Sequence, residues 1–200
     1  GQRRRVPNLH ATASLEWGLV VYAHGYVSPA EPVAIHEDQM AMADGTSIVD
    51  AFTLLGYAFA TTSYSTNGLA VTEGMADLVD LVDIFAAQKG PPDIIYLVGV
   101  SEGGLITTLA VEQHPHVFDG GMAVCGPCGG FRAQADYMGN FRVVFDYFFP
   151  DLMPGSLIDI PPSLVSDWDA HYEYIILPQI RDPANADKVD QLLNVTQAAY

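Results

Sequence analysis

Residues 94–104 have the sequence IIYLVGVSEGG, and this stretch decides the fold. Its first seven residues, Ile94–Val100, form a continuous apolar run of the length typical of a strand buried on both faces. Ser101 follows at once, and apolar residues then recur at helical spacing between residues 105 and 110. The stretch therefore predicts a strand, a tight turn and a helix.

Further apolar runs alternate with helical patterns on both sides of this stretch. The predicted elements are strands at 17–23, 57–62 and 121–124 and helices at 48–55 and 75–85. Thr72 is the predicted N-cap of the second of these helices. Strands that alternate with helices indicate an α/β fold, in which a parallel sheet is flanked by helices and each strand is buried on both sides.

The pattern changes after Gly130. Residues 131–200 show no convincing buried strand, and they contain aromatic residues, a Pro/Gly break from Pro150 to Pro162, and two later helical patterns at 164–176 and 189–193. We expect residues 1–130 to form the α/β core portion and residues 131–200 to form a C-terminal helical cap, or lid. Most of the aromatic residues from Phe131 to Phe149 are expected to form the core of the cap itself.

Gly99, Ser101 and Gly103 form a G-x-S-x-G motif between the predicted strand and helix. This is the context that a nucleophile elbow requires, so Ser101 is the predicted nucleophile. Glycine is expected at these two positions because the strand and the helix approach closely there and leave room only for a small residue. The N-terminus of the following helix would direct free N–H groups towards the point of attack. The alternative is a glycine-rich turn of structural use only.

A second element, His24-Gly25-Tyr26, follows the first clear strand. An oxyanion hole requires two N–H donors that converge on the developing negative charge. We predict that the Glu102 N–H is one donor and the Tyr26 N–H the other. His24 and Gly25 are expected to support this loop, with the His24 side chain bracing it and not transferring protons.

Three segments together resemble bacterial α/β-hydrolases with esterase or lipase-like activity: VVYAHGY (20–26), GYAFATTSYSTNG (56–68) and YLVGVSEGG (96–104). The resemblance extends over about residues 17–130 and is most specific at the elbow and the His-Gly loop. It implies hydrolysis of carboxylic esters through a seryl acyl-enzyme, without a cofactor, and we expect the substrate to be a small apolar or aromatic ester. It also implies Ser101 as nucleophile and Tyr26 and Glu102 as oxyanion donors.

The rest of the catalytic triad is not evident. In this family the acid and then the histidine follow the serine in the chain. The later histidines are His114, His116 and His171. The first two flank a proline at a predicted helix end, and His171 is expected to be a packing residue of the cap; Asp136 and Asp146 are conceivable acids that no spacing selects. We expect an incomplete α/β-hydrolase of weak activity, in which a missing segment or a second chain completes the sheet and triad.

Two other functions stay open. Cys125-Gly-Pro-Cys128 has the letters of a thiol–disulfide redox site, although the usual βαβ context and following helix are absent; a short local disulfide is the structural alternative. The second open function is that of a non-catalytic, ligand-binding relic of the hydrolase fold. His114-x-His116 with Asp119 lacks further well-spaced ligands, so no metal is predicted.

Composition excludes some partners. The chain has 24 acidic and 8 basic residues and a net charge of −16, which would repel nucleic acid; a solvated terminus explains the basic run Arg3–Arg5 better than a nucleic-acid or membrane arm. No apolar run is long enough to span a membrane. The sequence leaves the cellular location open.

Overall fold

The structure, a computed structural model, describes residues 9–10, 18–42 and 44–198. Its contacts divide the chain into two compact units, Gly1–Gly129 and Gly130–Tyr200. The boundary expected from the sequence lies between residues 130 and 131. The run Arg3–Arg5, predicted to be a solvated terminus, lies outside the described residues.

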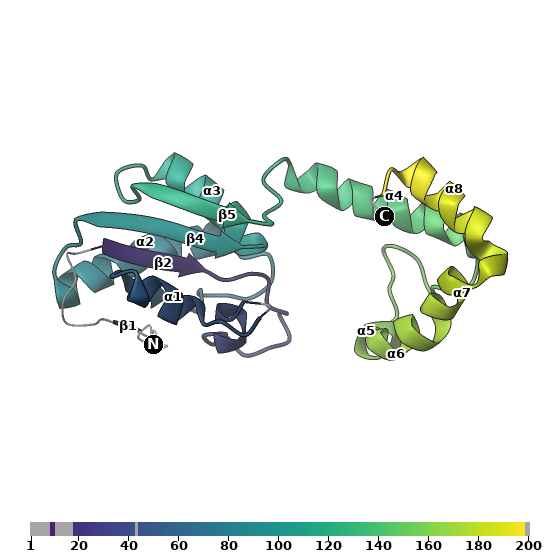
Figure 1. Cartoon of the computed structure of the whole chain (residues 1–200), viewed down its shortest axis with the longest axis horizontal. Helices are drawn as coiled ribbons and strands as arrows, with labels where there is room; N and C mark the ends of the chain where they lie inside the picture. Colours follow the sequence, from purple (N-terminus) through teal and green to yellow (C-terminus); the bar gives the residue numbers. More distant parts are fainter. Residues whose placement is uncertain (1–8, 11–17, 43, 199–200) are drawn as a thin grey trace. The chain divides into compact units, whose positions relative to one another are not determined.

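The first unit contains a five-stranded sheet in the order β1-β3-β2-β4-β5 (Figure 1). The strands are β1 (Leu9–His10), β2 (Gly18–Ala23), β3 (Ala58–Thr61), β4 (Ile94–Val100) and β5 (Gly120–Val124). Strands β2, β3, β4 and β5 run parallel to one another, whereas β1 pairs with β3 in the antiparallel direction. The predicted α/β class and parallel sheet are therefore confirmed, and β1 is an addition that the sequence did not indicate.

Helices cover both faces of this sheet. The helical elements are η1 (Glu37–Met40), α1 (Ile48–Leu54), α2 (Val71–Lys89) and α3 (Glu102–Gln113). Alternate residues of β2 enter two separate cores: Leu19 and Val21 pack with residues of α2 and α3, while Val20 and Tyr22 pack with residues of η1 and α1. Because both faces are buried, β2 needs apolar residues at every position and shows no alternation.

The edge strand β5 departs from the prediction that each strand is buried on both sides. It pairs with β4 alone, and the Met122 side chain is 51% exposed. Gly121 lies against Thr107 and Val111 of α3, which therefore packs on one face of the strand. The burial prediction is wrong for β5, because α3 is the described helix that packs on this strand and the face with Met122 stays exposed.

The second unit is helical. Its elements are α4 (Phe131–Phe148), α5 (Pro162–Ser166), α6 (Trp168–His171), the π-helical η2 (Tyr172–Ile176), α7 (Leu177–Arg181), η3 (Pro183–Asn185) and α8 (Ala186–Thr196). The predicted single helix at 164–176 is thus broken into short pieces. Pro178, near the start of α7, lacks the N–H that would continue the α-helical hydrogen-bond ladder, and the π-helical segment η2 directly precedes α7.

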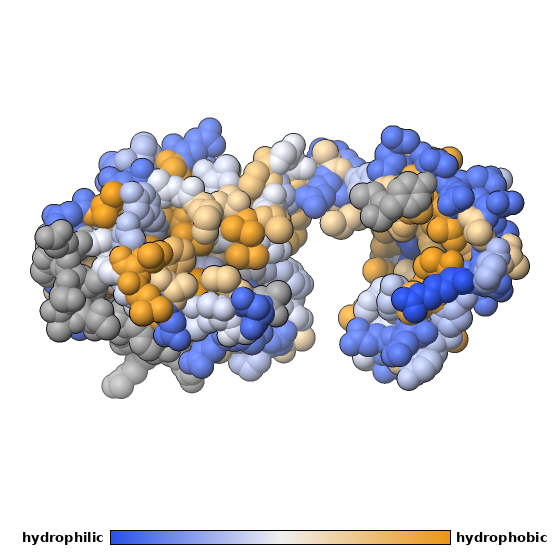
Figure 2. All heavy atoms as spheres, viewed as in Figure 1, coloured by the Kyte–Doolittle hydropathy of each residue, from blue (hydrophilic) through white to orange (hydrophobic). Residues whose placement is uncertain are grey.

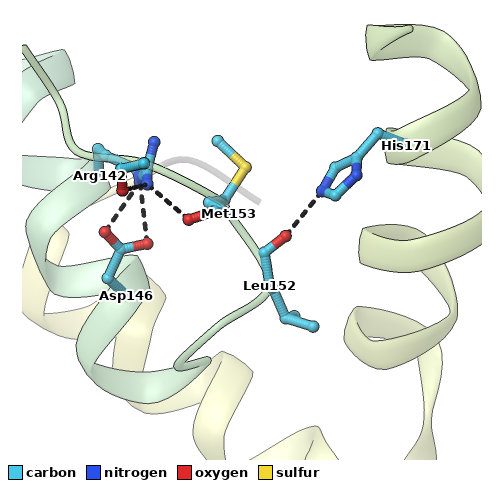
Figure 3. A network of polar contacts seen from close by, with 6 residues as sticks. Arg142, Asp146, Leu152, Met153 and His171 are labelled. Carbon is cyan, nitrogen blue, oxygen red and sulfur yellow. Dashed lines mark hydrogen bonds and ion pairs between the residues drawn. The ribbon is translucent and has the colours of Figure 1, made fainter. Parts of the chain in front are cut away.

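The core of this unit is small. Its buried members are Phe145, Phe149, Ile176 and Leu192. Arg142 lies beside this core, where its Nε donates to both carboxylate oxygens of Asp146 at 2.9 Å and its Nη2 donates to the Met153 carbonyl at 2.9 Å (Figure 3). The buried guanidinium therefore fastens the segment after α4 to the helix. The lid role of this unit remains a prediction.

Among the residues that the structure describes, no helix is long and apolar enough to cross a membrane. Apolar side chains nevertheless reach the surface of both units (Figure 2). In the second unit Ile158 and Val165 are among the most exposed. Each unit therefore has apolar surface that its own core does not use.

Candidate functional site

The candidate site lies at the carboxyl ends of β2 and β4. These strands are neighbours, and their register pairs Ala23 with Gly99. The chain adds β3 on one side of β2 and then β4 on the other, so the direction in which the sheet grows reverses here. In open α/β sheets, ligands bind outside the strand ends at such a reversal. The loop that begins at His24 and the turn at Ser101 follow these two strand ends directly.

Ser101 occupies a strained turn between β4 and α3. Its backbone has φ 57° and ψ −120°, a region that residues other than glycine rarely enter, and the residue is exposed. Such a conformation costs about 1–3 kcal/mol and persists only where the surroundings enforce it. Here the Ser101 N–H donates to the Val124 carbonyl at 2.9 Å, and the Ser101 carbonyl accepts from the Gly104 N–H at 2.9 Å.

The two glycines of the motif permit this turn because no Cβ fits at either position. A Cβ on Gly103 would lie 2.0 Å from the Ala23 carbonyl oxygen, and one on Gly99 would lie 2.1 Å from the Gly103 carbonyl oxygen. Both neighbours are backbone atoms, which cannot rotate away as a side chain would. Strand β4 and helix α3 therefore approach as closely as glycine allows.

The His-Gly loop lies beside the serine. A Cβ on Gly25 would be 3.5 Å from the Ser101 Cβ, so the two segments are in contact. Gln39 holds this loop: its Oε1 accepts from the Gly25 N–H at 2.7 Å and its Nε2 donates to the Tyr26 carbonyl at 3.3 Å. Gln39 lies in the short 3-10 helix η1, and the sequence did not point to it because it belongs to no motif.

Two backbone N–H groups lie in the segments that meet at the serine and lack an acceptor within the described chain. Among the residues that the structure describes, neither the Tyr26 N–H nor the Glu102 N–H has a hydrogen-bond acceptor. Tyr26 follows Gly25 in the loop that touches Ser101, and Glu102 is the first residue of α3. Free N–H groups at a helix N-terminus favour negative charge.

His24 lies beneath the loop and is 4% exposed. Its Nδ1 is 2.7 Å from the Gly25 carbonyl oxygen, and because a carbonyl only accepts, Nδ1 carries the proton. The ring stacks on Tyr64 at 3.8 Å, and the Tyr64 hydroxyl donates to the His24 carbonyl at 3.1 Å. Burial lowers the pKa of His24. A neutral ring in this position supports the loop from within.

The Glu102 side chain points away from the serine and into the unit. It is 6% exposed, and its Oε1 accepts from the Ala70 N–H at 2.6 Å. Ala70 is the N-cap of α2, so the predicted cap, Thr72, is wrong: Thr72 lies inside the helix and donates to Glu73 at 2.8 Å. The oxygen that binds the Ala70 N–H comes from 32 residues away, which no local pattern shows. Burial raises the pKa of Glu102.

The later histidines and the conceivable acids have other partners or positions. His171 Nε2 lies 2.7 Å from the Leu152 carbonyl oxygen within the second unit (Figure 3). Asp146 pairs with Arg142, and Asp136 lies 3.9 Å from Arg132. His114 and His116 follow the C-terminal end of α3, and at about 1.5 Å per residue they are about 18 Å along the helix from its start. None of these contacts assembles a base at Ser101.

Cys125 and Cys128 are both exposed free thiols, so the structure does not contain the disulfide left open by the sequence. The Cys128 sulfur lies 3.1 Å from the Thr108 hydroxyl oxygen and not against its partner thiol. A redox site activates its N-terminal thiol at a helix N-terminus, whereas Cys125 directly follows β5 and the next helix begins only at Phe131. The redox alternative has no support.

Nor does the His114 region form a metal centre in the part of the chain that is described. No three His, Cys, Asp or Glu side chains gather there in a group that could hold an ion. Asp119 has a structural contact instead, since its Oδ2 accepts from the Ile95 N–H at 2.7 Å.

A model of the prolyl oligopeptidase family matches residues 53–132. This segment begins within α1 and includes the whole elbow. The search of curated proteins found no match.

Several solved structures are similar to the chain. The rice cell wall degrading esterase LipA from Xanthomonas oryzae is 17% identical, with 92% of this chain and 54% of that chain covered and a TM-score of 0.43. Bacillus megaterium epoxide hydrolase is 18% identical, with coverages of 94% and 63% and a TM-score of 0.42. A structure from work on the metagenome-derived lipolytic enzymes LipS and LipT is 21% identical, with coverages of 60% and 46% and a TM-score of 0.38. The chain thus spans about half the length of the first of these structures.

Proposed function

We propose that this chain belongs to the α/β-hydrolases and carries the nucleophile and oxyanion hole of a serine hydrolase that acts on carboxylic esters. One observation carries the proposal. Ser101 is exposed at φ 57° between a buried strand and a helix N-terminus, in contact with a second loop whose next N–H is free. This arrangement suits attack on a carbonyl whose oxygen becomes negative, because each oxyanion donor stabilises such a transition state by about 3–4 kcal/mol.

The proposed reaction has two steps. The Ser101 Oγ attacks the ester carbonyl carbon, its proton passes to a base, and the tetrahedral intermediate expels the alcohol, which takes up that proton. Water then attacks the acyl-serine in the same way and releases the acid. The Tyr26 and Glu102 N–H groups donate to the carbonyl oxygen in both steps. The half-exposed Tyr26 ring offers contact to a small apolar or aromatic substrate.

The base and its acid are proposed to come from a further segment or from a second chain. Of the described histidines, His24 is buried, His114 and His116 are distant along α3, and His171 is bonded to the Leu152 carbonyl. His36 lies beside the His24 ring with its Nδ1 3.8 Å from Asp38, and it makes no hydrogen bond to Ser101. Without a base, a serine is a poor nucleophile near neutral pH. The 200-residue chain by itself is therefore expected to turn over esters slowly.

A serine-directed fluorophosphonate probe tests the proposal without requiring turnover. Because a base is missing at Ser101, we expect the label to attach slowly, but peptide mapping should find it at Ser101 in the native chain and not at Ser65, an exposed serine of the same unit. Ser101→Ala should abolish labelling, Ser65→Ala should leave it unchanged, and urea should remove the selectivity. Equal labelling of the two serines would show that the turn does not activate Ser101.

A second candidate, hydrolysis of a peptide bond, is favoured by the match of residues 53–132 to the prolyl oligopeptidase family. An aryl ester and an aminoacyl p-nitroanilide with proline at the acyl position separate the two. The ester proposal predicts faster turnover of the aryl ester after normalising for leaving-group reactivity. Turnover of the anilide alone, lost in Ser101→Ala, would assign the site to peptides.

A further inference from the structure

Glu102 joins the serine turn to another part of the unit. Its backbone begins α3 directly after Ser101, while its buried carboxyl binds the Ala70 N–H at 2.6 Å. Ala70 is itself 2% exposed and precedes α2, the longest helix of the first unit. A single side chain therefore connects the candidate oxyanion donor to the start of a helix that lies in the core.

We propose that Glu102 is a positioning residue, whose side-chain oxygen holds the peptide group between Ser101 and Glu102 in the orientation that aims its N–H at the substrate. The inference rests on the proposed function, because it assigns a task to a second group of the same residue. The carboxyl acts through the backbone and does not touch the reacting atoms.

The start of α2 supplies a rigid anchor for this contact. The Glu102 carboxyl accepts from the N–H of Ala70, the N-cap residue of the helix, and the same N–H also donates to the Gly68 carbonyl at 2.9 Å. The carboxyl therefore lies at the positive end of the helix dipole, which favours negative charge. Because Leu78, Leu81 and Phe85 bury α2 in the main core, the anchor cannot move without disturbing the unit.

The same anchor region also reaches the other donor loop. Tyr64, six residues before Ala70, is 4% exposed, stacks on His24 and donates to the His24 carbonyl. Burial, followed by the nearby Glu102 carboxyl, raises the pKa of Tyr64 well above its ordinary value. The segment 64–70 therefore contacts both strand-end loops of the candidate site, one through Tyr64 and one through Ala70.

The contact requires an acceptor and not a charge. Among the described residues, Glu102 Oε2 is buried without a hydrogen-bond partner, so only Oε1 takes part in the contact. A glutamine would present the same acceptor oxygen, whereas a methionine of similar size would present none. Glu102→Gln and Glu102→Met are therefore a matched pair, and Glu73→Gln, at the exposed first turn of α2, is the control.

The first measurement is the rate of fluorophosphonate labelling at Ser101, resolved into probe binding and the chemical step. Glu102→Met should slow the chemical step about tenfold, the effect of a lost buried hydrogen bond, with probe binding within about twofold. Glu102→Gln should recover most of that loss, and Glu73→Gln should match the wild-type chain. If Glu102→Met does not fold, Glu102→Asp, whose carboxyl is one methylene short of Ala70, should show the same slowing.

The second measurement is amide hydrogen exchange by NMR, which does not depend on activity. Glu102→Met should accelerate exchange at Ala70, Gly103 and Gly104 by about tenfold, and Glu102→Gln should not. Equal labelling in Glu102→Met and Glu73→Gln, or equal slowing in Glu102→Met and Glu102→Gln, would overturn the inference. If the wild-type chain does not label at Ser101, the proposed function fails. The exchange measurement then tests the inference by itself, and unchanged exchange at Gly103 and Gly104 in Glu102→Met would overturn it.

Discussion

Replacing Gly103 by alanine tests whether the close approach of α3 to β2 is what shapes the serine turn. The added Cβ would lie 2.0 Å from the Ala23 carbonyl oxygen and 2.6 Å from the His24 carbonyl oxygen. Ordinary carbon–oxygen contacts are about 3.3–3.6 Å, so α3 must move by about 1 Å or more. Overpacking of this kind costs about 3 kcal/mol or more, since both obstacles are backbone atoms.

Hydrogen exchange followed by mass spectrometry reports this cost for the first unit alone. A loss of about 3 kcal/mol corresponds to about 100-fold faster exchange of the protected amides in β4 and α3. Gly129→Ala is the control, because a Cβ there meets nothing within 4 Å. Exchange in Gly103→Ala within about threefold of that in Gly129→Ala would refute the account of a glycine-dependent turn.

Three further predictions concern other contacts. Ser101→Gly relieves the positive φ and should raise the free energy of unfolding by about 0.5–1 kcal/mol while abolishing the fluorophosphonate label. A lower free energy of unfolding in urea would contradict the conclusion that the Ser101 backbone is strained. The pKa of His24 is lowered, so the unfolded chain binds its proton first and stability falls as pH drops below the ordinary value of 6.5; unfolding measured from pH 8 to 5 should show this fall reduced in His24→Asn. Arg142→Met leaves Asp146 and two backbone carbonyls without their donor and should destabilise the second unit by about 3 kcal/mol, measured by exchange in α4, whereas Asp146→Asn should cost about 1 kcal/mol or less.

The sequence predicted those parts of the fold that depend on patterns of neighbouring residues. Strand β4 has the predicted limits, Ile94–Val100, and α3 begins directly after Ser101 as the motif indicates. Apolar runs and helical spacing are properties of neighbouring residues, and a buried parallel sheet requires both. The α/β class followed from their alternation.

The missed features depend on residues that are distant in the chain. Strand β1 is two residues long and exists only as a partner of β3. The Thr72 cap was predicted from a local preference, but the helix starts at Val71, and the carboxyl of Glu102, from another element, binds the N–H of its N-cap residue, Ala70. Gln39 likewise gains its role only when the loop at Gly25 folds against it.

The candidate site was predictable to the same extent. The letters around Ser101 identified the turn, because glycine at two positions is a steric requirement that sequence records directly. The base could not be predicted, since a triad is defined by positions in space and its histidine has no fixed distance from the serine in the chain.

The positive φ of Ser101 also limits what the five residues 99–103 can do outside this unit. Their shape is imposed by the Val124 carbonyl, which belongs to the neighbouring strand, and by the Ala23 carbonyl, which lies against Gly103. Excised as a peptide, or grafted onto a scaffold without those two strands, the motif would relax to an ordinary turn and withdraw the hydroxyl. The elbow therefore does not keep its shape alone, and grafting it onto another protein requires β2, β4 and β5 to be transferred with it.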